Sequence, residues 1–186
     1  MTELPRSLQD NPRPARWLGF AVPERVRLGT GKVELGQGIL TALVQKPKRL
    51  VYLSSGLHQS GDASLKDLVW EQRRWQGQQA YSDTKQHDVL LAFAVARRWP
   101  GVLSNALEPG WVPTKMGGPG APDDMDAAHR TQVWLAVSQD PAATVTGKYF
   151  FHMKLRTPNP VAHDTERQDA LLDACKRLSG VELPMR

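Results

Sequence analysis

One long helical pattern between two short apolar runs constrains this chain more than any other feature. Small and apolar residues recur at helical spacing through Gln79–Trp99, and Pro100-Gly101 ends the pattern. The runs on either side, Leu50–Leu53 and Val102–Leu107, are short and apolar, as buried strands are. This order predicts a right-handed crossover between two parallel strands. We expect Tyr149–His152 to follow as the third parallel strand, in the sheet order first run, second run, third run.

Tyr81 and Lys85 lie on the expected helix, four residues apart. This spacing stacks two side chains on one face of a helix. A phenol has an unperturbed pKa of about 10, and a neighbouring ammonium lowers that pKa because it favours the phenolate. Such a pair can pass a proton near neutral pH. The same spacing also occurs on solvated helix faces that do no chemistry, so these two residues alone leave both interpretations open.

Hydroxyl, proline and glycine residues follow the two runs that flank this helix. Ser54 and Ser55 come directly after the first run, and Pro109-Gly110 follows the second, with Val112 and Thr114 after it. A serine at a strand end, a Tyr-x-x-x-Lys helix and a Pro-Gly-x-Val-x-Thr loop, in this order, resemble the short-chain dehydrogenase/reductase family. The resemblance extends from about residue 39 to residue 151.

The resemblance implies an α/β fold: a partial Rossmann-like, three-layer arrangement in which helices flank a short parallel sheet. We expect residues 35–186 to form the C-terminal part of such a Rossmann domain. Residues 1–34 are expected to form an irregular or disordered basic arm, because prolines are scattered among their polar residues. The first 50 residues hold nine Lys and Arg against four Asp and Glu, and therefore carry the whole net charge of +5.

The resemblance also implies the roles of the site residues. Tyr81 would donate or accept the proton at a carbonyl or carbinol oxygen, Lys85 would assist it and hold the nicotinamide ribose, and Ser55 would hydrogen-bond to the substrate oxygen. The substrate would be a small carbonyl compound or alcohol, and NAD(P) would supply the hydride, which no side chain can provide. The residues expected to bind the cofactor are Tyr81, Lys85, Pro109, Gly110, Val112 and Thr114.

The segment between Ser55 and Tyr81 is longer than in the shortest members of the family. It is similar to the insert of retinol-dehydrogenase-like members, and it contains Trp70 and Trp75. These two aromatic side chains either line a substrate pocket or anchor a long loop to the surface. The sequence leaves both interpretations open.

The sequence departs from the family upstream of the first strand. A dinucleotide fold needs a glycine-rich turn, where pyrophosphate approaches backbone N–H groups at a helix N-terminus. The glycine clusters at 29–31 and 36–38 follow no convincing strand, and Val33 stands near the position of the family's catalytic asparagine. We therefore expect a truncated oxidoreductase that binds NAD(P) weakly or not at all. The alternative is a catalytically inactive remnant, or a non-enzymatic binding module that retains part of the fold.

Other features limit the partners and the compartment that we expect. The cations of the basic arm are dispersed, which argues against a nucleic-acid partner, and no apolar run approaches the ~18 residues of a membrane span. The five His residues never take a metal-binding spacing, and Ser55 with His58 lacks the Gly-x-Ser-x-Gly context of a hydrolase. A single cysteine, Cys175, suits a reducing compartment, so we expect a cytoplasmic protein. An open edge along Leu50–Leu53 would allow a homo-oligomer to form.

Overall fold

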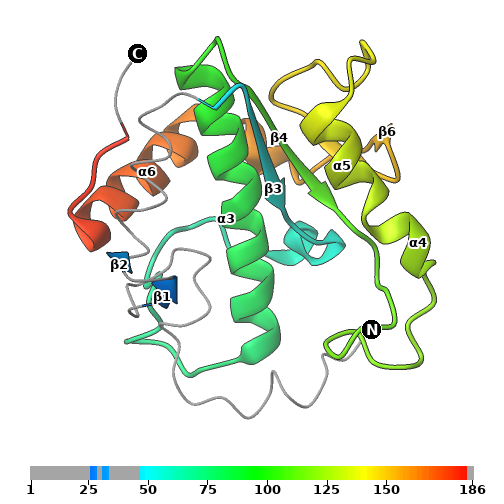
Figure 1. Cartoon of the computed structure of the whole chain (residues 1–186). Helices are drawn as coiled ribbons and strands as arrows, with labels where there is room; N and C mark the ends of the chain where they lie inside the picture. Colours follow the sequence, from blue (N-terminus) through cyan, green and yellow to red (C-terminus); the bar gives the residue numbers. More distant parts are fainter. Residues whose placement is uncertain (1–25, 29–30, 34–46, 184–186) are drawn as a thin grey trace.

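An open four-stranded sheet forms the centre of the protein (Figure 1). The computed structural model describes residues 26–28, 31–33 and 47–183. Strands β3 (Arg49–Leu53), β4 (Leu103–Glu108) and β5 (Tyr149–Phe151) run parallel in that spatial order. This order and these directions confirm the prediction, and so does the α/β fold class.

Strand β6 (Lys154–Leu155) pairs antiparallel with β5 and was not predicted. His152 and Met153 take positive φ angles of 46° and 60° in the turn between the two strands. Two-residue turns in which both residues have positive φ angles commonly join antiparallel strands. The prediction that His152 belongs to the strand is therefore wrong, because the chain reverses at that residue.

Helix α3 (Gly77–Arg98) makes the crossover from β3 to β4, as predicted. Val89, Ala92 and Phe93 of α3 form a buried cluster with Ala106 of β4 and Tyr149 of β5. Burial of these apolar side chains provides the main stabilisation of the helix on the sheet. The helix ends where expected, because Pro100 cannot continue it.

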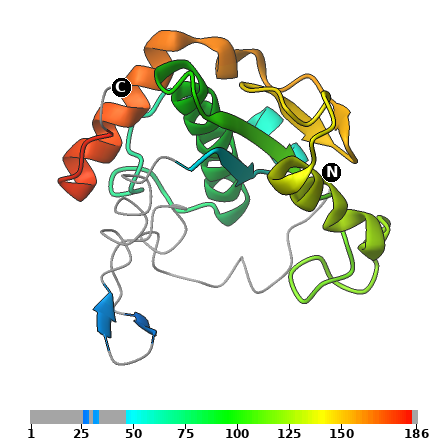
Figure 2. The same ribbon diagram turned by 45° about the horizontal axis from the view of Figure 1, so that its top comes forward.

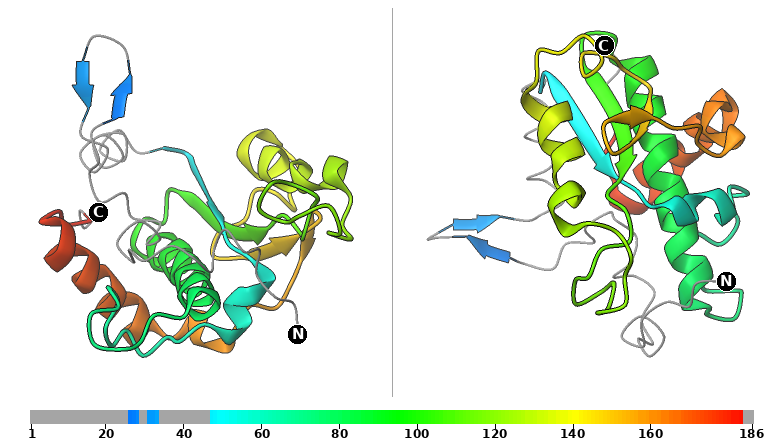
Figure 3. Two further views of the ribbon diagram at one scale, coloured as in Figure 1. Left: turned by 90° about the horizontal axis from the view of Figure 1, so that it is seen from below. Right: turned by 90° about the vertical axis from the view of Figure 1, so that its right-hand side faces the viewer.

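The opposite face of the sheet is covered by α5 (Arg130–Val137), which follows the short helix α4 (Met125–Ala128). Leu135 of α5 packs with Leu107 and Phe150 of the sheet. Figure 3 shows the resulting three layers, with α5 on one side of the strands and α3 on the other. The Arg49 guanidinium of β3 donates to the carbonyl oxygens of Leu135 (2.8 Å) and Ser138 (2.7 Å), so it caps the C-terminal end of α5.

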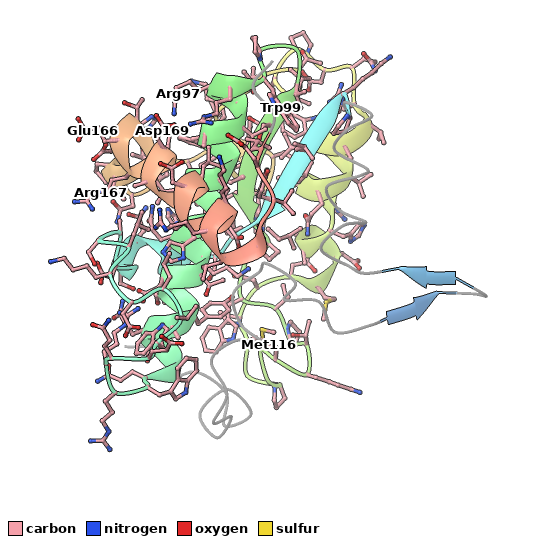
Figure 4. All side chains as sticks on the ribbon, turned by 90° about the vertical axis from the view of Figure 1, so that its left-hand side faces the viewer. Arg97, Trp99, Met116, Glu166, Arg167 and Asp169 are labelled. Atoms are coloured by element: carbon pink, nitrogen blue, oxygen red, sulfur yellow. The ribbon has the colours of Figure 1, made fainter. Side chains whose placement is uncertain are left out.

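Two further elements complete this part of the chain, η3 (Pro160–His163) and α6 (Thr165–Ser179), and α6 lies alongside α3 (Figure 2). Arg97 and Arg98 of α3 both pair with Asp169 of α6, and Figure 4 shows Arg97 beside Asp169. Burial alone would raise the pKa of Asp169, but the hydrogen bonds from Arg98 and Arg97 hold it below its usual range. The two arginines that close α3 therefore also dock α6.

Within the segment predicted to be an irregular arm, β1 (Val26–Leu28) and β2 (Gly31–Val33) pair as an antiparallel ribbon. The rest of that segment lies outside the described residues, as do the glycines at 36–38 and the expected helix end at 39–45. The division into an arm and a Rossmann-type part stays a prediction. Between β3 and α3 the chain forms the 3-10 helix η2 (Gly56–Ser60), followed by a long loop without regular structure.

Candidate active site

A pocket of about 300 Å³ opens at the carboxyl ends of β3 and β4. Open α/β sheets place their ligand crevice at this end of the strands. Its walls come from three parts of the chain: the end of β3 with Leu53 and Ser54, the first turns of α3 with Tyr81 and Lys85, and the loop after β4 with Pro109 and Met116. Trp75, Gly77, Ala80 and Thr84 complete the lining.

Tyr81 and Lys85 share the α3 wall of this pocket. The Lys85 ammonium nitrogen lies 5.8 Å from the centre of the Tyr81 ring. It donates to the carbonyl oxygen of Leu53 (2.8 Å) and to the carboxylate of Asp88 (2.9 Å). Burial raises the pKa of Asp88, although the Lys85 ammonium acts in the opposite direction. Lys85 thus connects the end of β3 to the helix that carries Tyr81.

The two adjacent serines have different surroundings. Ser54 is buried and lines the pocket, and its hydroxyl donates to the backbone carbonyl of Lys85 (2.8 Å). Ser55, the serine expected at the substrate, is not among the residues that line the pocket; it is the N-cap of η2, where its hydroxyl oxygen accepts from the N–H of Leu57 (3.3 Å). The proton of the Ser54 hydroxyl is therefore engaged, whereas that of Ser55 is free to donate to another acceptor. The sequence could not separate these two neighbours.

The loop after β4 contributes Pro109 to the pocket, but three expected cofactor residues do not line it. Gly110 has a φ of 91°, and a Cβ there would come within 2.7 Å of the Asp123 carboxylate. Only glycine fits this position without strain. The Thr114 hydroxyl accepts from the N–H of Gly117 (3.0 Å), and Val112 lies in the same turn. Gly110, Val112 and Thr114 therefore shape the loop that presents Pro109 and Met116.

Met116 is a pocket residue that the sequence analysis did not single out. The loop is closed internally: the Trp111 indole donates to the carbonyl of Gly117 (2.8 Å), and the N–H of Gly118 donates to the carbonyl of Thr114 (2.8 Å). Met116 is 48% exposed and lies towards the opposite end of α3 from Arg97 (Figure 4). A Met among glycines gave no periodic signal that could have placed it.

Buried polar side chains support the strand ends behind the pocket. His58 accepts from the N–H of Asn159 at Nε2 (3.1 Å), so Nδ1 carries the proton that it donates to the carbonyl of Ser55 (2.7 Å). Burial lowers the pKa of His58, which keeps the ring neutral. Glu108, at the end of β4, pairs with Arg156; burial raises the pKa of Glu108 and Arg156 opposes that shift. His58 is thus a structural link rather than a base for Ser55.

The two tryptophans of the long loop differ in their position relative to the pocket. Trp75 lines the pocket, whereas Trp70 packs against Trp75 with the ring centres 5.2 Å apart.

The described residues contain no group of three or more His, Cys, Asp or Glu side chains placed to hold a metal ion. Within the part of the chain that the structure describes, no helix has the length and apolar character of a membrane span.

No family model matches this chain. It is 41% identical over 150 residues to the short-chain dehydrogenase chry4 of Gibberella zeae, covering 78% of this chain and 58% of that protein. The short-chain dehydrogenase chyC of Penicillium rubens is 39% identical with the same coverage. Human retinol dehydrogenase 13 is 32% identical over 180 residues, which cover 83% of this chain and 54% of that protein. The chain therefore spans a little more than half the length of these relatives.

A solved structure supports the fold. The crystal structure of an uncharacterized protein from Mycobacterium paratuberculosis superposes with a TM-score of 0.64 at 23% identity, covering 86% of this chain and 63% of that one. At this identity the likeness concerns the fold alone. The fold and the sequence relatives together show that this chain belongs to the short-chain dehydrogenase/reductase family, with retinol dehydrogenase 13 among its relatives.

Proposed function

We propose that this chain carries the proton-transfer and substrate-binding part of an NAD(P)-dependent oxidoreductase that interconverts a small carbonyl compound and its alcohol. The observation that supports this most is the position of Tyr81 and Lys85 on one wall of a pocket at the carboxyl ends of parallel strands. A phenol beside an ammonium is suited to give a proton to a developing alkoxide and to take it back in the reverse direction.

Three side chains divide the work on the substrate oxygen. Tyr81 transfers the proton, and the positive charge of Lys85 favours the phenolate form that results. The Ser55 hydroxyl, whose proton is free, donates to the substrate oxygen and orients it. The bond from the Ser54 hydroxyl to the Lys85 carbonyl keeps the helix at a fixed distance from the strand end. Ser55, Tyr81 and Lys85 are therefore the proposed catalytic residues.

The described residues suit the nicotinamide end of the cofactor. Pro109 offers an apolar wall for a flat ring, and the Lys85 ammonium can donate to ribose hydroxyls in place of the oxygens it now contacts. When bound, the cofactor supplies the hydride. Among the described residues, no glycine-rich turn opens a helix in the manner of a pyrophosphate site. We therefore propose that this part of the protein holds the nicotinamide end, aided by Gly110, Val112 and Thr114 through the shape of their loop.

A chimera tests this function. The part of the Gibberella zeae relative that precedes the aligned region is joined to residues 47–186, and reduction of aromatic and aliphatic ketones is followed by NADPH and NADH absorbance. We expect turnover, and Tyr81→Phe should lower it by about 10²- to 10⁴-fold, the range for loss of a general acid. Tyr52→Phe is the matched control, because Tyr52 packs in the core rather than in the pocket.

Both alternative functions predict the opposite result in this assay. A catalytically inactive remnant or a binding module would give a folded chimera without turnover. Activity that survives Tyr81→Phe would show that the proposed proton donor is wrong. Equal losses for Tyr81→Phe and Tyr52→Phe would mean that the effect comes from the fold rather than from the site.

A further inference from the structure

The loop of residues 61–76, here called the insert loop, has one defined shape although it contains no helix or strand. Leu65, Asp67 and Trp70 adopt left-handed φ angles of 58°, 56° and 57°. Residues other than glycine keep such a backbone only where the surrounding contacts impose it. The insert loop is therefore a built element, and its contacts indicate what it is built to hold.

Asp67 organises the second half of the insert loop. Its carboxylate accepts from the backbone N–H groups of Glu71 (2.7 Å), Gln72 (3.0 Å) and Arg73 (2.9 Å). Three donors on one carboxylate close the chain into a tight turn around it. This turn brings the Arg73 side chain back towards α3.

Arg73 and Asp83 then connect the insert loop to α3. The Arg73 guanidinium donates to the Asp83 carboxylate (2.8 Å) and lies 3.6 Å over the Trp70 ring. Asp83 is only 2% exposed, and it also accepts from the N–H of Asp62 (2.8 Å) and from the side chain of Gln79 (2.7 Å). Both ends of the insert loop are thus bonded to a single carboxylate.

The position of Asp83 in α3 relates these bonds of the insert loop to the pocket. Asp83 is two residues from both Tyr81 and Lys85, and two residues turn an α-helix by roughly 200°. The insert loop is therefore bonded to the side of α3 that faces away from the pocket. From there it leads around the start of the helix and places Trp75 in the pocket wall, with Trp70 packed edge-on behind it. The Arg73–Asp83 pair thus attaches the insert loop to α3 two residues before Trp75.

The pocket lining near Trp75 has little to offer a charged ligand. Leu53, Ala80, Pro109 and Met116 are apolar. Of the described residues that line the pocket, Lys85 alone carries a charge, and that charge is already paired with the carboxylate of Asp88 (2.9 Å). A carboxylate moved into these surroundings would lose hydration and gain little attraction in return. An indole face favours a flat apolar group instead.

We propose that the insert loop sets the substrate preference: Trp75 contacts the substrate, Arg73 and Asp83 position Trp75, and the pocket takes an uncharged aromatic ketone or aldehyde. This inference rests on the proposed function in that it names the substrate class of the same pocket. Arg73 and Asp83 act through Trp75, and neither touches the substrate.

Binding to the full chain tests this without any turnover. Calorimetric titration compares 2-acetonaphthone with 6-acetyl-2-naphthoic acid, which has the same ring system plus one carboxylate. We expect the neutral ketone to bind at least about tenfold more tightly. Trp75→Ala should weaken its binding about tenfold, whereas Trp75→Phe should restore most of the affinity because it keeps an aromatic wall.

A double-mutant cycle separates positioning from general stability. Arg73→Gln should weaken binding of 2-acetonaphthone severalfold, but it should cost nothing further once Trp75 is Ala, because Arg73 acts only through Trp75. Arg97→Gln is the matched control: Arg97 also pairs with an aspartate, but on the α6 side of α3. Thermal melts of every variant check that the fold is retained.

Four results would overturn the inference: no saturable binding of 2-acetonaphthone, equal binding of the carboxylate, unchanged affinity in Trp75→Ala, or additive losses in the double mutant. The titration requires neither hydride nor proton transfer. A chimera without turnover would therefore contradict the proposed function and leave the binding result standing, and the reverse outcome would reject the substrate class alone.

Discussion

At the scale of single residues, Lys85 forms two hydrogen bonds with the end of β3, as a donor in one and as an acceptor in the other. Its ammonium donates to the Leu53 carbonyl, and its own carbonyl accepts from the Ser54 hydroxyl. These two bonds join neighbouring positions on the strand to one position on the helix. The distance between Tyr81 and the strand end is thereby fixed by contacts that need no ligand.

The two serines should respond differently to substitution. In the chimera we expect Ser55→Ala to lower kcat by about 10²-fold, because it removes a donor to the reacting oxygen. Ser54→Ala should lower kcat less but reduce the free energy of unfolding by about 1 kcal/mol, because it removes the bond to Lys85. Steady-state kinetics and urea unfolding measure the two effects. A larger kcat loss for Ser54→Ala would move the catalytic role to that residue.

His87 should make the stability sensitive to acid. It is 3% exposed, and neither of its ring nitrogens has a hydrogen-bond partner. Burial lowers its pKa to about 4, against a raising effect of Asp83. The unfolded chain takes up this proton below about pH 6.5, while the folded chain resists until about pH 4. Stability is therefore complete above pH 6.5 and falls by about 3 kcal/mol as the pH drops to 4.

Urea unfolding between pH 7.5 and pH 4 measures this loss. In His87→Leu, the part of the acid dependence that belongs to this side chain should disappear, and stability at neutral pH should not fall, since an unpaired buried polar group is removed. His163→Gln is the control, because His163 is exposed. If the free energy of unfolding falls equally with acid in His87→Leu and in the unsubstituted chain, groups other than His87 are responsible for the loss.

At the scale of elements, periodicity was enough to find the strands and helices that carry the site. The apolar runs and the α3 pattern predicted β3, β4, β5 and the crossover between the first two. Tyr81 and Lys85 could be placed on one helix face by spacing alone, and both line the pocket. Local pattern suffices for features that depend on neighbours three or four residues apart.

Local sequence patterns could not predict the contacts between segments that are distant in sequence. Nothing in the spacing joins Arg73 to Asp83, because the insert loop has no period and the pair depends on three left-handed residues. The choice between Ser54 and Ser55 depends on which hydroxyl faces Lys85, and Met116 enters the pocket through hydrogen bonds inside its loop. Turn geometry and side-chain hydrogen bonds decide these features.

The cap on α5 should be measurable as stability. Arg49→Met removes the two guanidinium bonds to the last carbonyls of α5 and keeps much of the apolar stem. We expect the free energy of unfolding to fall by about 1.5–3 kcal/mol, the range for hydrogen bonds that involve a charged group. Arg49→Lys should recover part of this loss, since it keeps the charge but not the fork. Arg130→Met, at the exposed start of α5, is the control; equal losses there would contradict a capping role.

At the scale of the whole molecule, the two edges of the sheet differ. Within the described residues β3 pairs with a strand on one side only, and its last residue, Leu53, is 48% exposed. The other edge, β6, has two residues, so it offers few backbone groups to a partner. A longer edge with an apolar residue is the more effective template for association.

We therefore expect the chain to associate through β3 at micromolar concentration. Leu53→Lys places a charge on this edge and should shift the sedimentation coefficient towards the monomer. Leu155→Lys makes the same change on β6, where the residue is 67% exposed, and should have no effect. A chain that sediments as a monomer without substitution would show that the β3 edge is not a site of association.

The contact between Arg49 and the end of α5 also has a consequence for the order in which the protein folds. Its two bonds join positions 86 and 89 residues apart in sequence, whereas β3, α3 and β4 follow one another directly. A contact that closes so long a loop carries a large entropic cost, so it forms after the local crossover unit has collapsed. Substitutions at Arg49 should consequently accelerate unfolding and leave the refolding rate nearly unchanged, because the cap is absent from the transition state.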